Sequence, residues 1–330
     1  MDRRDFITLL GGAAAWPTAA QAQQRERMRR IGVLSVAAED DRSIQAPLAT
    51  LRASLAQLGW VEGRNLRLDI RYGSADPRRV HDLAIELAGL LPDAIVTASA
   101  LAMREVQQQT QTIPIIITGA GDPEASGFIK NIARPEGNTT GITNLYASIG
   151  GRWLELLKQA FPALARVALL YDPQLNTDPG GVYMPSAEEA AGALGVKSAR
   201  VAFHDTLDIV RALDAFAAES NGGVIVMPPP PNAGNRETIR RLAIEHRLPV
   251  MYHASQYAAE GGLMAYGSNE VDRMRRSASF VDRILRGAKV SDLPLEFPTR
   301  FELTINLKTA KAIGLTIPES LLLVADGVIE

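Results

Sequence analysis

The stretch Ile31-Gly-Val-Leu-Ser-Val36 is a short, β-branched, apolar run, and a segment with leucines at helical spacing follows it. Similar pairs of strand and helix patterns recur along the chain, which is typical of βα units that build a parallel sheet. The predicted strands are residues 31–36, 66–72, 94–97 and 113–118 in the first half, and residues 167–171, 196–203, 223–227 and 248–252 in the second. The sequence therefore predicts an α/β fold.

The two sets of predicted strands are spaced alike. Each strand of the second set starts between 129 and 136 residues after its counterpart in the first set, which indicates two copies of one architecture. Apolar stripes at 47–58, 78–91, 186–194 and 206–218 predict helices that cover the sheets. We expect two doubly wound, Rossmann-like lobes. Because ligands bind outside the carboxyl ends of such strands, two facing lobes would enclose a cleft.

The composition excludes several classes of protein. The chain of 330 residues is 46% hydrophobic and 22% charged, as folded globular proteins are. Its net charge of -2 supplies no basic field for nucleic acid, so no such partner is expected. It has no cysteine, and its 4 histidines lack the spacing of a zinc site, which argues against a metal or other cofactor. No G-x-S-x-G motif is present, so we expect no catalytic residues and no enzyme.

Residues 1–22 predict export. Arg3-Arg4 precede a short apolar run and the sequence Ala20-Gln-Ala22, which together form the pattern of a cleaved signal peptide. The paired arginines before Asp5-Phe-Ile favour the twin-arginine route, and an ordinary secretory signal with a chance Arg-Arg is the alternative. No later segment offers about 18 consecutive apolar residues, and no cysteine is available for a lipid anchor. We therefore expect a freely diffusing periplasmic protein that is not a lipoprotein.

Several short strings in one order resemble a known family. They are Leu58-Gly-Trp-Val-Glu-Gly-Arg-Asn65, Gly121-Asp-Pro123, Ala133-Arg-Pro-Glu-Gly-Asn-Thr-Thr-Gly141, Gly261-Gly-Leu-Met-Ala-Tyr-Gly267 and the segment 301–318. Together they resemble the ABC-transporter substrate-binding protein family, in its tryptophan- and tyrosine-receptor-like group, over essentially the whole mature chain. The resemblance implies the type I periplasmic-binding-protein fold, in which a three-strand hinge joins two lobes that close on one small solute.

The resemblance also implies domain bounds and partners. The first lobe is expected at 29–142 plus 265–298 and the second at 146–262 plus 300–330, with crossings near 141–145, 262–266 and 299–303. A monomeric receptor of this kind delivers its solute to an ABC permease in the inner membrane. A periplasmic sensor that presents its ligand to a membrane signalling receptor is the alternative.

In the first lobe the candidate ligand contacts follow the third and fourth strands. Thr97 ends the third strand, and Ser99 can cap a helix whose free backbone N–H groups would hold a carboxylate; a plain cap is the alternative. Gly119 and Gly121 allow the backbone to approach a ligand closely. Asp122 is placed either to pair with an ammonium or only to shape the turn that follows.

In the second lobe the candidates again follow strand ends. Asn176 lies in a loop that often faces the ligand in the family, and Met227 ends a strand before a polyproline turn. Tyr252 suits stacking on a planar ligand, whereas His253 beside it is more simply read as structural.

The last two candidates end a crossing strand. Ser268 or Asn269 would cap the next helix and also face the cleft. The expected ligand is an α-amino acid, with an aromatic one favoured by the resemblance, and an aromatic or carboxylate metabolite is the alternative.

Export gives the first testable prediction. Because signal peptidase cuts after the A-x-A sequence, the mature protein should begin at Gln23. Sequencing the N-terminus of protein isolated from the periplasm checks this. An uncleaved chain recovered from the cytoplasm would contradict it.

Overall fold

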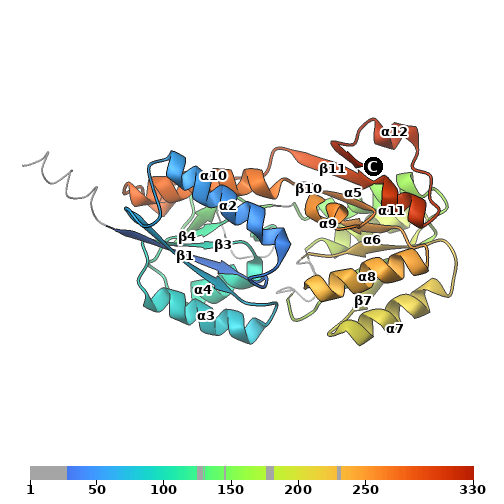
Figure 1. Cartoon of the computed structure of the whole chain (residues 1–330), viewed down its shortest axis with the longest axis horizontal. Coiled ribbons are helices and arrows are strands. Elements are labelled where there is room, and N and C mark those ends of the chain that lie inside the picture. Colours follow the sequence, from blue (N-terminus) through green and yellow to red (C-terminus); the bar gives the residue numbers. More distant parts are fainter. Residues whose placement is uncertain (1–27, 125–128, 130, 145, 176–181, 229–231) are drawn as a thin grey trace, which may run out of the picture.

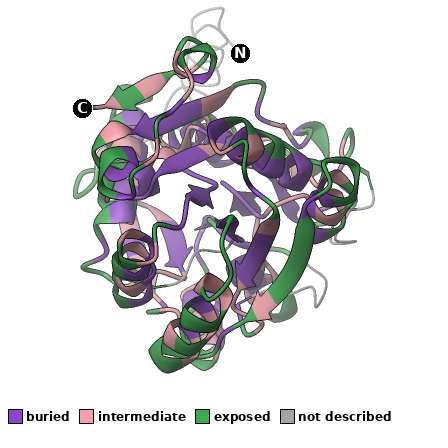
Figure 2. Cartoon of the chain, turned by 90° about the vertical axis from the view of Figure 1, so that its right-hand side faces the viewer, coloured by how far each residue is buried: buried purple, intermediate pink, exposed green. Residues whose placement is uncertain are grey.

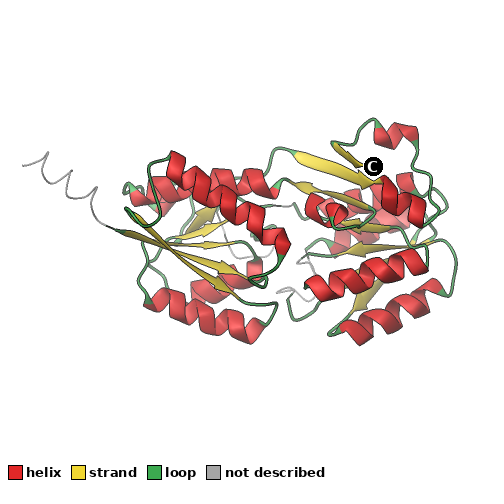
Figure 3. Ribbon diagram, in the orientation of Figure 1, coloured by secondary structure: helices red, strands yellow, loops and turns green. Residues whose placement is uncertain are grey.

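The computed structural model describes residues 28–330 except 125–128, 130, 145, 176–181 and 229–231. These residues form two α/β lobes that lie next to each other, each built on its own sheet with helices on both faces (Figures 1 and 3). The predicted α/β class with two doubly wound lobes is confirmed. The expected signal peptide, 1–22, lies outside the described residues. None of the helices described here has the length and apolar character that a membrane span requires.

The first lobe holds a five-stranded parallel sheet with the strand order β2-β1-β3-β4-β5. Its elements are β1 (Arg29–Ser35), α2 (Arg42–Gln57), β2 (Leu66–Tyr72), α3 (Pro77–Gly89), β3 (Ala94–Thr97), α4 (Ala100–Gln109), β4 (Ile115–Ile117), β5 (Thr139–Gly141) and, from much later in the chain, α10 (Glu270–Leu285). Helix α10 packs beside α2, and its Phe280 and Val281 join Leu51 and Leu55 in one buried cluster.

The second lobe holds a seven-stranded sheet with the order β7-β6-β8-β9-β10-β11-β12. Its elements are α5 (Ile149–Ala160), β6 (Arg166–Tyr171), α6 (Met184–Ala193), β7 (Lys197–Ala202), α7 (Thr206–Ala217), β8 (Gly222–Val226), α8 (Ala233–Glu245), β9 (Val250–Tyr252), α9 (Ser255–Ala259), β10 (Met264–Ser268), β11 (Phe301–Asn306), α11 (Leu307–Ala312), α12 (Glu319–Leu322) and β12 (Gly327–Ile329). A 3-10 turn, η1 (Val290–Asp292), precedes β11 and packs on the first lobe. Its first five strands are parallel and repeat the order of the first lobe, as two copies of one architecture would. β11 then adds antiparallel to β10.

Helix α2 begins earlier than its apolar stripe predicted. The stripe predicted a start at residue 47, whereas the helix begins at Arg42 and contains Pro47. The side chain of Asp41 accepts a hydrogen bond from the backbone N–H of Ser43 at 3.0 Å and so caps the helix one turn upstream. This cap brings Asp41 to the edge of the first lobe.

The chain passes between the lobes at three places: after β5, between β10 and α10, and before β11. All of β10 is paired within the seven-stranded sheet, Ala265 with Tyr252 on one side and Ser268 with Phe301 on the other. The passage into α10 therefore comes at Asn269, after the boundary expected at 265. The remaining expected bounds of the lobes stay predictions.

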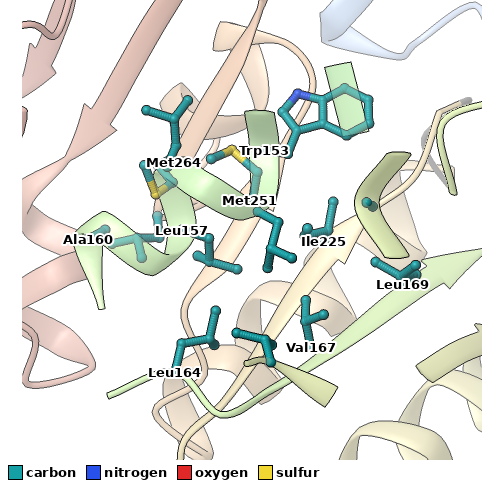
Figure 4. Packing of buried hydrophobic residues seen from close by; sticks show 14 of the residues in the cluster. Trp153, Leu157, Ala160, Leu164, Val167, Leu169, Ile225, Met251 and Met264 are labelled. Atoms are coloured by element: carbon teal, nitrogen blue, oxygen red, sulfur yellow. The ribbon is translucent and has the colours of Figure 1, made fainter. Parts of the chain in front are cut away.

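Each lobe has its core between the sheet and the helices that cover it, and the outward helix faces are exposed (Figure 2). In the second lobe, Trp153 on α5 is fully buried and donates a hydrogen bond from Nε1 to the carbonyl oxygen of Tyr266 at 2.7 Å. Leu157, one turn further along the same helix, packs against the sheet residues Val167 and Ile225 (Figure 4).

This packing predicts a matched pair of leucine substitutions. Leu157→Ala removes a fully buried side chain and should lower the free energy of unfolding by about 2–5 kcal/mol. Leu207→Ala, on helix α7 where the side chain is 61% exposed, should change it by less than about 0.5 kcal/mol. Denaturant titration of both variants measures the difference, and equal losses would contradict the packing described.

Candidate ligand-binding site

A cavity of about 640 Å³ lies between the two lobes. Its lining follows the carboxyl ends of β1, β3 and β4 in the first lobe and of β6, β8, β9 and β10 in the second. Doubly wound sheets place ligand sites at these strand ends. The volume is within the range of about 300–1,000 Å³ that is usual for sites of small molecules.

The N-terminus of helix α4 faces this cavity. Ser99 caps the helix, because its Oγ accepts a hydrogen bond from the N–H of Ala102 at 3.1 Å, and Ala100 and Leu101 line the cavity beside it. The remaining N–H groups of the first turn favour an anion there. Thr97 is fully buried behind them and is not among the lining residues.

Gly119 and Gly121 both line the cavity with positive φ angles of 146° and 72°. The N–H of Gly121 donates to Oδ1 of Asn144 at 2.8 Å. A Cβ atom at Gly121 would lie 2.5 Å from the hydroxyl oxygen of Tyr183 in the opposite lobe. Glycine at this position therefore lets the two lobes approach each other across the cavity.

Asp122 is not among the described residues that line the cavity. Its Oδ2 accepts a hydrogen bond from the N–H of Ala147 at 3.2 Å, next to the first crossing. Asn176 lies outside the described residues.

The predicted residues at the ends of β8 and β9 differ in whether they line the cavity. Tyr252 and His253 line the cavity at the end of β9. Met227 instead packs in the hydrophobic core of the second lobe, and the next residue, Pro228, lines the cavity in its place. Burial, with the nearby Arg273 and Arg236, lowers the pKa of His253 to about 3, so the imidazole is neutral at physiological pH.

Ser268 and Asn269 have separate roles. Ser268 lines the cavity, and its hydroxyl donates to the carbonyl oxygen of Asn144 at 2.6 Å. Asn269 does not line the cavity but caps α10, with its Oδ1 accepting from the N–H of Asp272 at 2.9 Å and its Nδ2 donating to Glu302 at 2.9 Å.

Two charged residues on the first turn of α10 also line the cavity. Arg273 is 7% exposed; its Nε donates to the carbonyl oxygen of Thr118 at 2.9 Å, and its Nη1 donates to the carbonyl and hydroxyl oxygens of Ser268 at 2.9 and 2.6 Å. Glu270 accepts from Nε2 of Gln256 at 2.6 Å. Within the described part of the chain, no carboxylate lies within 4.0 Å of the Arg273 guanidinium.

Burial disfavours the charged form of both side chains. It raises the pKa of Glu270, and neither the charge of Arg273 nor the hydrogen bond from Gln256 restores the ordinary value. It also lowers the pKa of Arg273, partly offset by the charge of Glu270. The site thus holds a carboxylate and a guanidinium that would both gain from opposite charges on a ligand.

A second pair of charged residues at the cavity is neutralised within the protein. Asp41 in the first lobe and Arg236 in the second both line the cavity and form an ion pair with each other. Burial alone would raise the pKa of Asp41, but the hydrogen bonds from Arg236 and Ser43 outweigh it and lower the pKa. Among the residues with described positions, no cluster of three or more metal-binding side chains is found.

Sequence reasoning reached Ser99, Gly119, Gly121, Tyr252 and Ser268 because they follow strand ends. It missed the charged helix residues Arg236, Glu270 and Arg273, which line the cavity from first turns of helices. The helix caps were the available signal. Arg236 comes four residues after the cap Asn232, and Glu270 and Arg273 come one and four residues after the cap Asn269. Charged residues at these positions belong to the helix turn that lies beside the cleft.

Comparison with known proteins supports this architecture. The chain is 22% identical over 267 residues to a tyrosine-binding protein of Clostridioides difficile, covering 79% of this chain and 74% of that protein. It superposes with a TM-score of 0.82 on the ABC domain of Streptococcus pneumoniae in complex with L-Trp, at 22% identity, covering 92% of this chain and 100% of that one. A ligand-free, open substrate binding protein with adhesive properties from Clostridium difficile gives a TM-score of 0.64 at 22% identity, covering 92% and 99%.

Family comparison is decisive for classification. Residues 31–329 match the model of the ABC transporter substrate binding proteins, a family of solute-binding proteins and not of enzymes. The two doubly wound lobes and the cavity at their facing strand ends agree with that match. The chain belongs to the ABC transporter substrate-binding protein family.

Proposed function

We propose that this protein is the periplasmic receptor of an ABC importer and closes on one free α-amino acid, with an aromatic amino acid as the leading candidate. The observation that carries the proposal is the pair of oppositely charged groups, Glu270 and Arg273, that line one cavity without an ion pair between them. An α-amino acid carries an ammonium and a carboxylate on one carbon, and so can meet both charges at once.

The proposed arrangement assigns each end of the ligand backbone. The ligand carboxylate binds the Nη2 side of Arg273 and the N-terminus of α4 at Ser99, where both a full and a partial positive charge are available. The ammonium binds Glu270. The aromatic side chains of Tyr183, Tyr252 and Tyr257 line the remaining space and suit a planar apolar group.

The relatives support the same ligand class. One is a tyrosine-binding protein, and another was solved in complex with L-Trp. The proposed function includes delivery of the solute to an inner-membrane permease, because receptors of this family serve a transporter. It also includes export by the predicted signal peptide and a monomeric state.

A substitution of Glu270 tests the ammonium contact. Glu270→Gln keeps the size of the side chain and its contact with Gln256 but removes the charge. Losing one partner of a buried charge pair costs about 2–5 kcal/mol, so the dissociation constant for L-tryptophan should rise about 30-fold or more. Calorimetric titration measures it, with 3-indolepropionate, which lacks the ammonium, as the comparison ligand. Its binding should not weaken in the variant.

Two further variants serve as controls. Asp272→Asn changes a carboxylate on the same helix turn whose side chain is 52% exposed and should leave the affinity unchanged. Asp122→Asn tests the other candidate for the ammonium contact. If Asp122→Asn weakens L-tryptophan binding and Glu270→Gln does not, the assignment to Glu270 is wrong.

A further inference from the structure

Asp41 and Arg236 join the two lobes directly. The Nη2 of Arg236 lies 3.0 and 3.2 Å from Oδ1 and Oδ2 of Asp41, and Nη1 lies 3.2 Å from Oδ2. The side chains are only 5% and 8% exposed, and the residues are 195 positions apart in the sequence. This bidentate geometry is that of a strong, directional ion pair.

Each partner is also held by its own lobe. Asp41 caps α2 through the N–H of Ser43, at the end of the helix where a negative charge is favourable. Arg236, on the first turn of α8, donates from Nε to Glu260 at 3.0 Å and lies over the ring of Tyr257 at 5.1 Å. These contacts orient both charged groups before they meet.

The contacts that each residue makes within its own lobe determine the free-energy cost of breaking the ion pair. Breaking a buried ion pair is expensive when it leaves a charge without any partner. Here, opening the lobes would leave Asp41 with its helix N-terminus and Arg236 with Glu260 and Tyr257. The pair can therefore form and break as the lobes move, without leaving either charge bare.

The position of the pair connects it to lobe movement. Helices α2 and α8 belong to different lobes, and their N-terminal ends meet across the space between the lobes (Figure 1). Neither helix contains one of the three crossings of the chain, and the pair lines the same cavity as Arg273 and Glu270. A contact between the lobes that the crossing segments do not themselves make is broken when the lobes move apart.

We infer that Asp41 and Arg236 form a latch that stabilises the closed arrangement of the lobes by a protein–protein contact independent of the solute. Part of the free energy of closure then comes from the protein itself. Because apparent affinity scales with the fraction of molecules in the binding-competent arrangement, the latch raises the affinity for any solute that the closed cavity accepts.

Small-angle X-ray scattering of the ligand-free protein tests the latch. The radius of gyration of the wild type should be close to that calculated from the structure with the ion pair formed, and that of Asp41→Asn should be larger. Asparagine caps helices as well as aspartate does, so the variant removes the charge and keeps α2. The matched control is Asp76→Asn, because Asp76 is exposed and caps α3 in the same lobe through the N–H groups of Arg78 and Arg79.

A second variant tests the other side of the pair. Arg236→Gln should enlarge the ligand-free protein as Asp41→Asn does, and the double variant should be no larger than either single one, since all three remove the same contact between the lobes, whereas the contacts of Arg236 with Glu260 and Tyr257 lie within the second lobe. Equal radii of gyration for the wild type and both single variants would overturn the latch.

An affinity measurement adds a second readout, which rests on the proposed function. Titration with L-tryptophan should give a dissociation constant about ten-fold higher for Asp41→Asn than for the wild type or Asp76→Asn. Failure of the wild type to bind any amino acid would overturn the proposed function, and the scattering measurements alone would then decide whether the latch exists. An unchanged dissociation constant in Asp41→Asn would overturn the latch's part in binding.

Discussion

A single residue, Asn269, joins strand β10 of the second lobe to helix α10, which packs in the first. So short a link fixes the first turn of α10 at the meeting point of the two lobes. Arg273 on that turn then bonds the carbonyl oxygen of Thr118 in the first lobe and Ser268 in the second. The buried guanidinium therefore holds the strand ends of both lobes at the floor of the cavity, and the rest of the site is arranged around it.

The charges at the cavity fall into two groups with different consequences. Asp41, Arg236 and Glu260 are satisfied by each other, so closing the lobes brings no isolated charge into a region of low dielectric constant. Glu270 and Arg273 have no such mutual contact. In the proposed function, a solute with only an anionic or only a cationic group would neutralise one of them and leave the other buried, so the proposed site favours molecules that carry both charges.

The fold was largely readable from the sequence, because buried parallel strands are β-branched apolar runs and their spacing repeats. Strand β5 was missed, since Thr139-Thr-Gly141 is too short and polar to stand out as a strand. In the site, residues after strand ends were predictable because topology alone brings them to the cleft. The orientation of helix residues was not, because it depends on how the helix packs: Arg273 is buried at the cavity, whereas its neighbour Asp272 points to solvent.

The order of elements along the chain also governs how the protein can be made. Helix α10 completes the core of the first lobe, yet it follows nearly all of the second lobe in the sequence. Strands β11 and β12 complete the second sheet only at the very end of the described chain. On the ribosome the first lobe cannot reach its final packing until most of the second has been synthesised, although domains ordinarily fold one after another as they emerge. Both lobes therefore complete their packing late in synthesis.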